Sequence, residues 1–224
     1  MIVLSQTVVI TGANRGIGLA FSTYYAKQGA KVYAVCRQAS SALEALEVTV
    51  LSGIDVSKAD AIPMLRNALE GESIDLLINN AGILRDERLG EIDFDQITEQ
   101  FQVNALGPLR VVEALLDFMP DGSKIANITS RMGSIEDNTS GGRYGYRMSK
   151  CALNIASVSL AHDLRARDIA VGIFHPGLVG TEMIGGYGDI TPEQAAERLV
   201  KLIDQLDMSR SGEFRHSNGE LLPW

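Results

Sequence analysis

Short apolar runs alternate along the chain with longer stretches in which apolar residues recur at helical spacing. The short runs predict strands near residues 7–10, 31–35, 49–51, 75–78, 124–128, 170–174 and 213–216. The longer stretches predict helices near residues 17–28, 58–69, 94–119, 146–167 and 192–206. Strands that alternate with helices in this way are typical of βαβ units. We therefore expect an α/β fold with a parallel sheet of about seven strands and helices on both faces.

Nothing in the sequence marks a boundary between domains. The chain has 224 residues, which is enough for one sizeable core and too few for two ordinary catalytic domains. Glycine-rich stretches at residues 140–145 and 185–188 lie between expected elements and predict mobile loops. Thr191 and Pro192 form a favourable cap and first-turn pair for the last helix. We expect a single domain that comprises residues 1–224.

The composition argues against several kinds of function. A net charge of −8 would repel a phosphate backbone, so we do not expect nucleic acid as a partner. No apolar run approaches the ~20 residues that cross a bilayer, and residues 1–6 lack the basic segment of a leader. We therefore expect a soluble, cytoplasmic protein. The two cysteines and three histidines show no disulfide or metal-ligand spacing, so we expect no metal site.

A glycine-rich turn follows the first expected strand and leads directly into a helix. Its sequence, residues 11–18, is Thr-Gly-Ala-Asn-Arg-Gly-Ile-Gly. Such a turn offers a phosphate the free N–H groups and positive end of the helix, and glycine allows the close approach. The order of strand, turn and helix predicts a dinucleotide site in a Rossmann-like, doubly wound sheet. The spacing is GxxxGxG, whereas most such sites have GxGxxG.

Further motifs lie at the ends of later strands or on helices. They are Asp55, at the end of the third strand, Asn79-Asn80-Ala81-Gly82, Asn104, Ser130, Tyr146 with Lys150, and Pro176-Gly177 with Thr181. Together with the GxxxGxG turn, their order resembles the short-chain dehydrogenase/reductase family over nearly the whole chain. Residues 143–147 and 211–224 are most similar to the C-factor and sniffer-type carbonyl reductase branch of that family.

The resemblance implies an oxidoreductase that uses a nicotinamide dinucleotide to interconvert a carbonyl compound and an alcohol. The family's cofactor-binding positions correspond here to Gly12, Asn14, Arg15, Gly16, Ile17, Gly18, Arg37, Asp55, Val56, Asn80, Ala81, Gly82, Tyr146, Lys150, Pro176, Gly177, Val179 and Thr181.

The end of the second expected strand favours NADP(H) over NAD(H). NAD-specific proteins carry an acidic residue there, which binds the ribose hydroxyls and repels a 2′-phosphate. This chain has Cys36, followed by Arg37, and a second arginine, Arg15, lies inside the glycine-rich turn. Two guanidinium groups can hold a phosphate dianion through charge-assisted hydrogen bonds.

Tyr146 and Lys150 lie four residues apart, so on a helix their side chains leave the same face. A cation near a phenol favours the phenolate and lowers its pKa from the usual ~10. The family resemblance implies that Tyr146 is the general acid/base, that Lys150 activates it and binds the nicotinamide ribose, that Ser130 holds the substrate oxygen, and that Asn104 binds a relay water. Alone, Tyr146 and Lys150 would be an ordinary amphipathic pair. Tyr144 cannot replace Tyr146, because Met148 stands four residues after it.

Two other functions are compatible with this fold. One is a nucleotide-sensing or signalling protein of the C-factor type with weak or vestigial reductase activity, although all four expected catalytic residues are present. The other is an extended-type epimerase or dehydratase, which needs a larger C-terminal portion than this chain has after Pro176-Gly177.

The substrate end and the assembly are less explicit in the sequence. Ser130 and Tyr146 are sixteen residues apart, a longer separation than is typical of the family. The apolar residues expected to line the substrate pocket are Met132, Tyr144, Met183 and Tyr187. A short flap over them predicts an open pocket that accepts several carbonyl compounds. Residues 94–119 and 146–167 are apolar beyond a single stripe, and the corresponding helices pair between subunits in this family. We therefore expect a homodimer or homotetramer.

Overall fold

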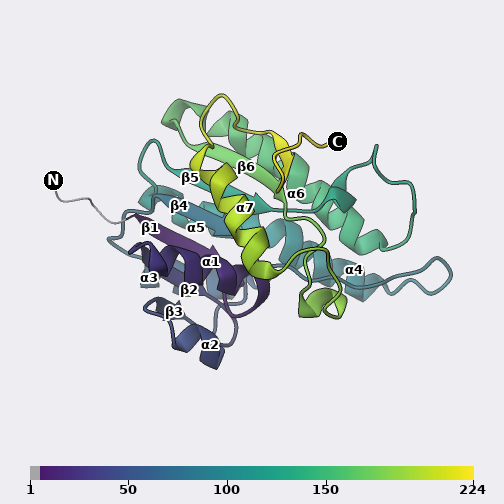
Figure 1. The fold of residues 1–224 in the computed structure, drawn as a ribbon, viewed down its shortest axis with the longest axis horizontal. Coiled ribbons are helices and arrows are strands. Elements are labelled where there is room, and N and C mark those ends of the chain that lie inside the picture. The colour runs from purple at the N-terminus through teal and green to yellow at the C-terminus, as the bar shows by residue number, and fades with distance from the viewer. Residues whose placement is uncertain (1–5) are drawn as a thin grey trace.

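A computed structural model describes residues 6–224 and contains a seven-stranded parallel sheet with helices on both faces (Figure 1). The strands are β1 (Thr7–Thr11), β2 (Lys31–Val35), β3 (Thr49–Leu51), β4 (Leu76–Asn79), β5 (Lys124–Ile128), β6 (Ala170–His175) and β7 (Phe214–His216). They lie in the order β3-β2-β1-β4-β5-β6-β7, and each neighbouring pair is parallel. The expected α/β fold class is confirmed. Residues 1–5, which belong to the N-terminal segment expected to lack a leader, lie outside the described residues.

Seven α-helices connect these strands over residues 6–224. They are α1 (Gly16–Lys27), α2 (Ser41–Glu44), α3 (Ile62–Ala68), α4 (Phe94–Phe101), α5 (Gly107–Leu115), α6 (Tyr144–Asp163) and α7 (Pro192–Asp204). Single 3₁₀ turns occupy Ala59–Ala61, Leu116–Phe118, Arg131–Gly133, Arg165–Arg167 and Glu182–Ile184, and a π-helical turn occupies Gln102–Leu106. In this described part of the chain, no helix is both long and apolar enough to cross a membrane.

The two faces of the sheet are covered by different helices. Helices α1 and α7 lie on one face (Figure 1), where Phe21 of α1 and Leu199 of α7 pack together with Ile10 of β1. Leu65 of α3 and Val111 of α5 belong to the core on the other face. All five side chains are fully buried. Burial on both sides explains why the central strands read as continuous apolar runs.

The long helix expected over residues 94–119 is interrupted in the structure. α4 ends at Phe101, the π-helical turn follows, and α5 begins at Gly107. Pro108 has no N–H to donate to the preceding turn, and Gly107 packs so closely on Val56 that a Cβ would lie 3.0 Å from its methyl group. Because π-helical turns inside a helix often occur at functional sites, the position of Asn104 within this one is of interest.

Other boundaries differ by smaller amounts. Helix α2 was not expected; it is one short turn, capped by the side chain of Ser40. The helix expected over residues 58–69 starts as a 3₁₀ turn before Pro63. Helix α6 starts at Tyr144, so Gly145 is helical although the glycine-rich sequence predicted a loop. The predicted cap of α7 is confirmed as a capping box between Thr191 and Gln194.

Candidate active site

A cleft of about 650 Å³ opens beyond the carboxyl ends of the central strands, where the strand order reverses between β1 and β4. Doubly wound sheets bind dinucleotides at this switch point. The expected cofactor residues that line the cleft are Gly12, Asn14, Arg15, Gly16, Ile17, Arg37, Asp55, Val56, Asn80, Ala81, Gly82, Tyr146, Lys150, Pro176 and Thr181. The fold thus brings residues from most of the chain to one site.

The glycine-rich turn packs tightly against the loop after β4. Gly12 has a φ of +67°, and a Cβ there would lie 2.8 Å from the backbone of Ala81. The Asn80 amide donates hydrogen bonds to the carbonyls of Thr11 and Gly12, at 3.1 and 3.2 Å. A Cβ on Gly18 would overlap the carbonyl of Gly12. The turn therefore leaves backbone groups at the start of α1 open to the cleft, as a pyrophosphate requires.

The ends of β2 and β3 form the side of the cleft expected to hold the adenosine. Cys36 and Arg37 line it directly after β2. Asp55 was expected to end the third strand, but β3 ends at Leu51 and the chain turns at Gly53 before it reaches Asp55. Burial raises the pKa of the Asp55 carboxyl, yet hydrogen bonds from Ser57 and the charges of Arg37 and Lys58 hold that pKa below its usual value.

Arg15 extends from the glycine-rich turn to the flap after β6. Its Nη1 lies 2.5 Å from Oε2 of Glu182, in the 3₁₀ turn of the flap. Nearby, a Cβ on Gly16 would lie 3.4 Å from the Thr181 methyl group. Figure 1 shows this flap in yellow-green just below the α4 label. The flap and the turn therefore meet across the mouth of the cleft.

Tyr146 lines the cleft from the first turn of α6 and is 9% exposed. Burial holds the pKa of its phenol above the usual value, although the nearby Ser130 hydroxyl and the charge of Arg143 lower that pKa in part. Ser130 follows β5 by two residues, and its Oγ accepts a hydrogen bond from Met132 N at 3.1 Å. The two hydroxyls expected to hold and protonate a substrate oxygen therefore lie together.

Lys150 lies one helical turn after Tyr146 and is buried in the same cleft. Its Nζ donates a hydrogen bond to the carbonyl of Ile128 at 2.9 Å and lies 5.8 Å from the centre of the Tyr146 ring. Burial lowers the pKa of Lys150 to about 8. None of the ion pairs formed within residues 6–224 includes Lys150. Its charge therefore faces the cleft without a carboxylate partner from this region.

Asn104 is fully buried in the π-helical turn. Its Oδ1 accepts a hydrogen bond from Ile83 N at 2.8 Å, and its Nδ2 donates to Ile83 O and to Ser149 Oγ. A Cβ on Gly82 would lie 3.3 Å from Asn104 Oδ1 and 3.6 Å from Lys150 Nζ, so the two groups approach the same point of the backbone. The side chain of Asn104 thus ties the loop after β4 to α6, through Ser149.

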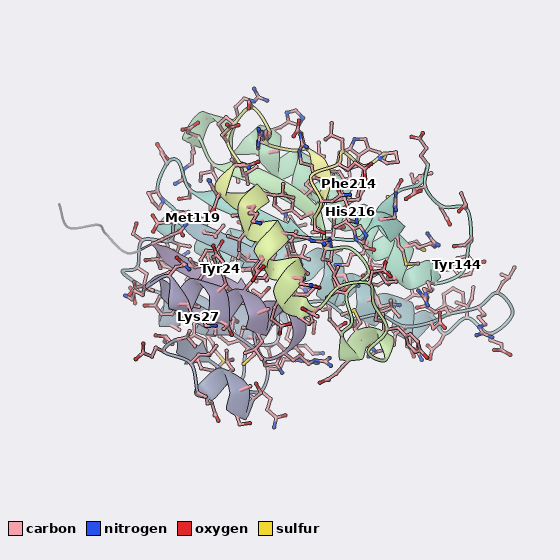
Figure 2. The ribbon with its side chains drawn as sticks, viewed as in Figure 1. Tyr24, Lys27, Met119, Tyr144, Phe214 and His216 are labelled. Carbon is pink, nitrogen blue, oxygen red and sulfur yellow. The ribbon has the colours of Figure 1, made fainter. Side chains whose placement is uncertain are left out.

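Several residues expected at the site lie outside the cleft lining. Among the cofactor positions these are Gly18, Gly177 and Val179, and Gly18 instead allows α1 to pack on the turn. Of the four expected substrate contacts, only Met183 lines the cleft. Tyr187 is 82% exposed, and Tyr144 lies at the start of α6 beside the loop that precedes it (Figure 2). Met132 follows Ser130, and its sulfur accepts a weak contact from Arg143.

The sequence did not single out several residues that line the cleft. They are Gln38, Ile54, Ile83, Val103, Ile128, Thr129 and Glu182. Most directly adjoin expected residues, so the motifs point to the right segments. Glu182 is different, because its contact with Arg15 joins positions 167 residues apart and no local pattern announces it.

A comparison with known families now identifies the chain. The model of the short-chain dehydrogenase family matches residues 6–203. The chain belongs to this family. Its members are oxidoreductases, as the resemblance of the motifs implied.

Individual relatives support the narrower branch. The chain is 39% identical to the 1-hydroxy-2-glutathionyl-2-methyl-3-butene dehydrogenase of Rhodococcus sp. strain AD45, over 98% of this chain and 100% of the relative. It is 41% identical to the C-signal protein of Myxococcus xanthus, over 67% of this chain and 93% of that protein. The structure of carbonyl reductase Sniffer of D. melanogaster matches with a TM-score of 0.89 and 30% identity, over 98% and 100% of the two chains. An NADPH-bound carbonyl reductase from chicken fatty liver matches with a TM-score of 0.87 and 27% identity, over 98% and 99%.

Proposed function

We propose that this member of the short-chain dehydrogenase family is an NADP(H)-dependent carbonyl reductase, which also catalyses the reverse oxidation, with Tyr146 as its general acid and base. One observation carries the proposal. Tyr146, close enough to the Ser130 hydroxyl for that group to lower its pKa and one turn from the buried Lys150, lies in the same cleft as the glycine-rich turn.

The geometry supports a simple division of work among these residues. Bound NADPH would supply a hydride to the carbonyl carbon. The Ser130 hydroxyl holds the carbonyl oxygen, and the Tyr146 hydroxyl transfers its proton to that oxygen as negative charge develops there. The ammonium group of Lys150 stabilises the resulting phenolate. A proton from solvent then restores Tyr146, and we assign Asn104 to the positioning of the relay next to Lys150. The product is an alcohol, which has gained one hydride and one proton.

The residues around the cleft fit a dinucleotide with a 2′-phosphate. Arg15 and Arg37 both line the cleft, and no acidic side chain stands directly after β2, where it would repel a phosphate. One similar solved structure, the chicken carbonyl reductase, was determined with NADPH bound. On these grounds we assign NADP(H), and not NAD(H), as the cofactor.

The relatives narrow the compounds worth testing. The name of the Rhodococcus relative describes the dehydrogenation of a hydroxy compound that carries a glutathionyl group. The chicken and fly proteins are named as carbonyl reductases. A screen should therefore follow NADPH consumption with aliphatic and aromatic carbonyl compounds, and NADPH formation with hydroxy thioethers of glutathione.

Replacement of Tyr146 by Phe tests the proposal directly. The variant keeps the ring but loses the transferable proton, so kcat should fall by about 10²–10⁴ while the Kd for NADPH changes little. Ser159→Ala, a change on the same helix at an exposed hydroxyl that bonds only the Ile155 carbonyl, is the matched control. A fall of less than about tenfold in Tyr146→Phe would contradict the role of this residue.

The identity to the C-signal protein supports a second candidate, a signalling protein that retains the nucleotide site with weak or vestigial activity. All four residues of the expected catalytic set are present, which favours the enzyme. NADPH binding without turnover of any compound in the screen would favour the signalling protein. The cytoplasmic location and the homo-oligomeric state that the sequence suggested stay predictions.

A further inference from the structure

Glu87 is a buried carboxylate that the proposed mechanism does not use. It lies in the loop between β4 and α4 and is 4% exposed. The ion pairs found within residues 6–224 include its neighbour Asp86 but not Glu87. A carboxylate in such a place is costly unless hydrogen bonds satisfy it, so its partners indicate what it does.

Each oxygen of the Glu87 carboxylate faces a different donor. Oε1 accepts a hydrogen bond from Nε2 of Gln100, which is also fully buried. Oε2 accepts one from the backbone N–H of Gly145, at 3.3 Å. The Gln100 amide is fixed in this orientation, because its Oε1 accepts a hydrogen bond from Arg85 N at 2.9 Å. A glutamine at position 87 could satisfy only one of the two donors, so the site requires two acceptor oxygens.

These contacts hold the start of the catalytic helix α6. Its cap residue, Arg143, has a left-handed conformation with φ 51° and provides no side-chain cap. The carbonyl of Glu87 accepts a hydrogen bond from Arg143 N at 3.0 Å, in addition to the carboxylate contact with Gly145 N. Glu87 thus satisfies two backbone donors that the helix leaves free, and its charge lies at the positive end of the helix dipole.

Gly145 is adapted to this contact. A Cβ at that position would lie 2.7 Å from Glu87 Oε1 and 2.9 Å from the backbone of Ile97 in α4. Any side chain there would push the carboxylate or α4 away from the first turn of α6. The next residue in this turn is Tyr146, so the carboxylate lies one residue from the phenol of the proposed chemistry.

We propose that Glu87 is the positioning residue that holds Tyr146 beside Ser130, by capping the first turn of α6 from the loop after β4. The inference rests on the proposed function. Lys150 lies a turn further along α6 and is held by the Ile128 carbonyl, so it does not depend on this cap. Loss of the Glu87 cap should therefore affect proton transfer far more than cofactor binding.

The test uses Glu87→Gln and the double variant Glu87→Gln with Gln100→Glu. The single variant places an amide N–H₂ against a donor, so kcat should fall about tenfold or more, while the Kd for NADPH stays within about twofold. The double variant exchanges the two groups, restores an acceptor for every donor and should return kcat to within about threefold of the wild type. Glu99→Gln, which removes only the exposed ion pair with Arg85, is the matched control and should leave kcat unchanged.

The pH profile separates positioning from general destabilisation. The nearby Ser130 hydroxyl lowers the pKa of Tyr146, so a displaced Tyr146 should show its kinetic pKa at a higher pH in Glu87→Gln than in the wild type. If Glu87→Gln does not fold, Gly145→Ala disturbs the same contact from the helix side and should show the same loss of kcat with NADPH affinity retained.

The outcomes distinguish this inference from the proposed function. Unchanged turnover in Tyr146→Phe overturns the proposed function. Loss of turnover in Tyr146→Phe together with an unchanged kcat and pH profile in Glu87→Gln overturns only the role of Glu87. Failure of the double variant to recover activity also counts against it, because the proposed contact is then not what the single variant lost.

Discussion

At Lys150 the charge that the proposed mechanism needs conflicts most directly with the stability of the fold. The proposed mechanism needs a cation beside the Tyr146 phenol, yet the side chain is buried with one carbonyl as its hydrogen-bond partner. Burial of a charge favours the neutral form, which is why the pKa of Lys150 falls to about 8. Near neutral pH the folded protein must nevertheless hold the cation. Active sites often retain such groups at a cost in stability.

This conflict predicts how stability depends on pH. In the unfolded chain Lys150 titrates at the ordinary pKa of 10.5, and in the folded chain at about 8. Between these values the unfolded state binds more protons, so the contribution of Lys150 to the free energy of unfolding becomes less unfavourable as the pH rises. The full penalty, on the order of 3 kcal/mol, applies below about pH 8.

Lys150→Met, which removes the charge, should therefore be more stable than the wild type at pH 7. Its advantage should shrink between about pH 8 and 10.5. Urea unfolding of both proteins at pH 7 and pH 10 measures the difference, and activity should be lost in the variant at either pH. A difference in unfolding free energy that does not vary with pH would mean that burial does not displace this titration.

The site residues that the sequence identified are those with a local signal. Tyr146 and Lys150 share a helix face and the glycine-rich turn is contiguous, so both can be matched to motifs of the family. Glu87 and Glu182 carry no such signal, because each acquires its partner from a distant part of the chain. From sequence alone, an acidic residue in a loop is expected to be exposed to solvent, and only the fold shows that it is buried or paired.

At the scale of elements, the strands were the most predictable part. They are short, apolar and separated by clear turns, and both faces are covered. The bounds of the helices were less predictable. Residues 94–119 keep an apolar stripe throughout, yet the π-helical turn and Pro108 divide them into α4 and α5. The apolar pattern shows which side is buried but does not show where the backbone hydrogen bonds change register.

The contact between the glycine-rich turn and the flap makes a prediction about cofactor choice. Arg15 is the proposed ligand of the 2′-phosphate, and Glu182 of the flap pairs with it. Arg15→Gln should weaken NADPH binding by about tenfold to a hundredfold, the value of a charge-assisted hydrogen bond, and leave NADH binding nearly unchanged.

Glu182→Gln should have the opposite and smaller effect on NADPH binding. It frees Arg15 for the phosphate, but both side chains of the pair are half or more exposed, so NADPH binding should tighten by no more than about fivefold. Fluorescence titration of the wild type, Arg15→Gln and Glu182→Gln with NADPH and with NADH measures the Kd of each protein for each cofactor. If Arg15→Gln weakened the binding of NADPH and NADH equally, the Arg15 side chain would not bind the 2′-phosphate.

For the whole molecule, the alternation of strands and helices was sufficient to predict a parallel α/β sheet, and the motifs placed its cleft. The assembly of copies of the chain is a different matter, because it depends on the surface. Helices α4 and α6 pack together, and their outer sides carry large exposed apolar residues. Phe94 of α4 is 73% exposed, and Met148 and Ile155, seven residues apart on α6, are 49% and 65% exposed.

Residues seven apart lie on the same face of a helix, so Met148 and Ile155 form one exposed apolar stripe on α6. Closed two-fold assemblies bury such self-complementary surfaces, and we expect a homodimer or homotetramer in solution. Light scattering should give a mass of two or four chains. Ile155→Asp, which places a charge in the stripe, should shift the mass toward one chain. Met64→Asp is the matched control, since Met64 is exposed on α3, away from the stripe, and its variant should keep the wild-type mass. A wild-type protein with the mass of one chain would contradict this assembly.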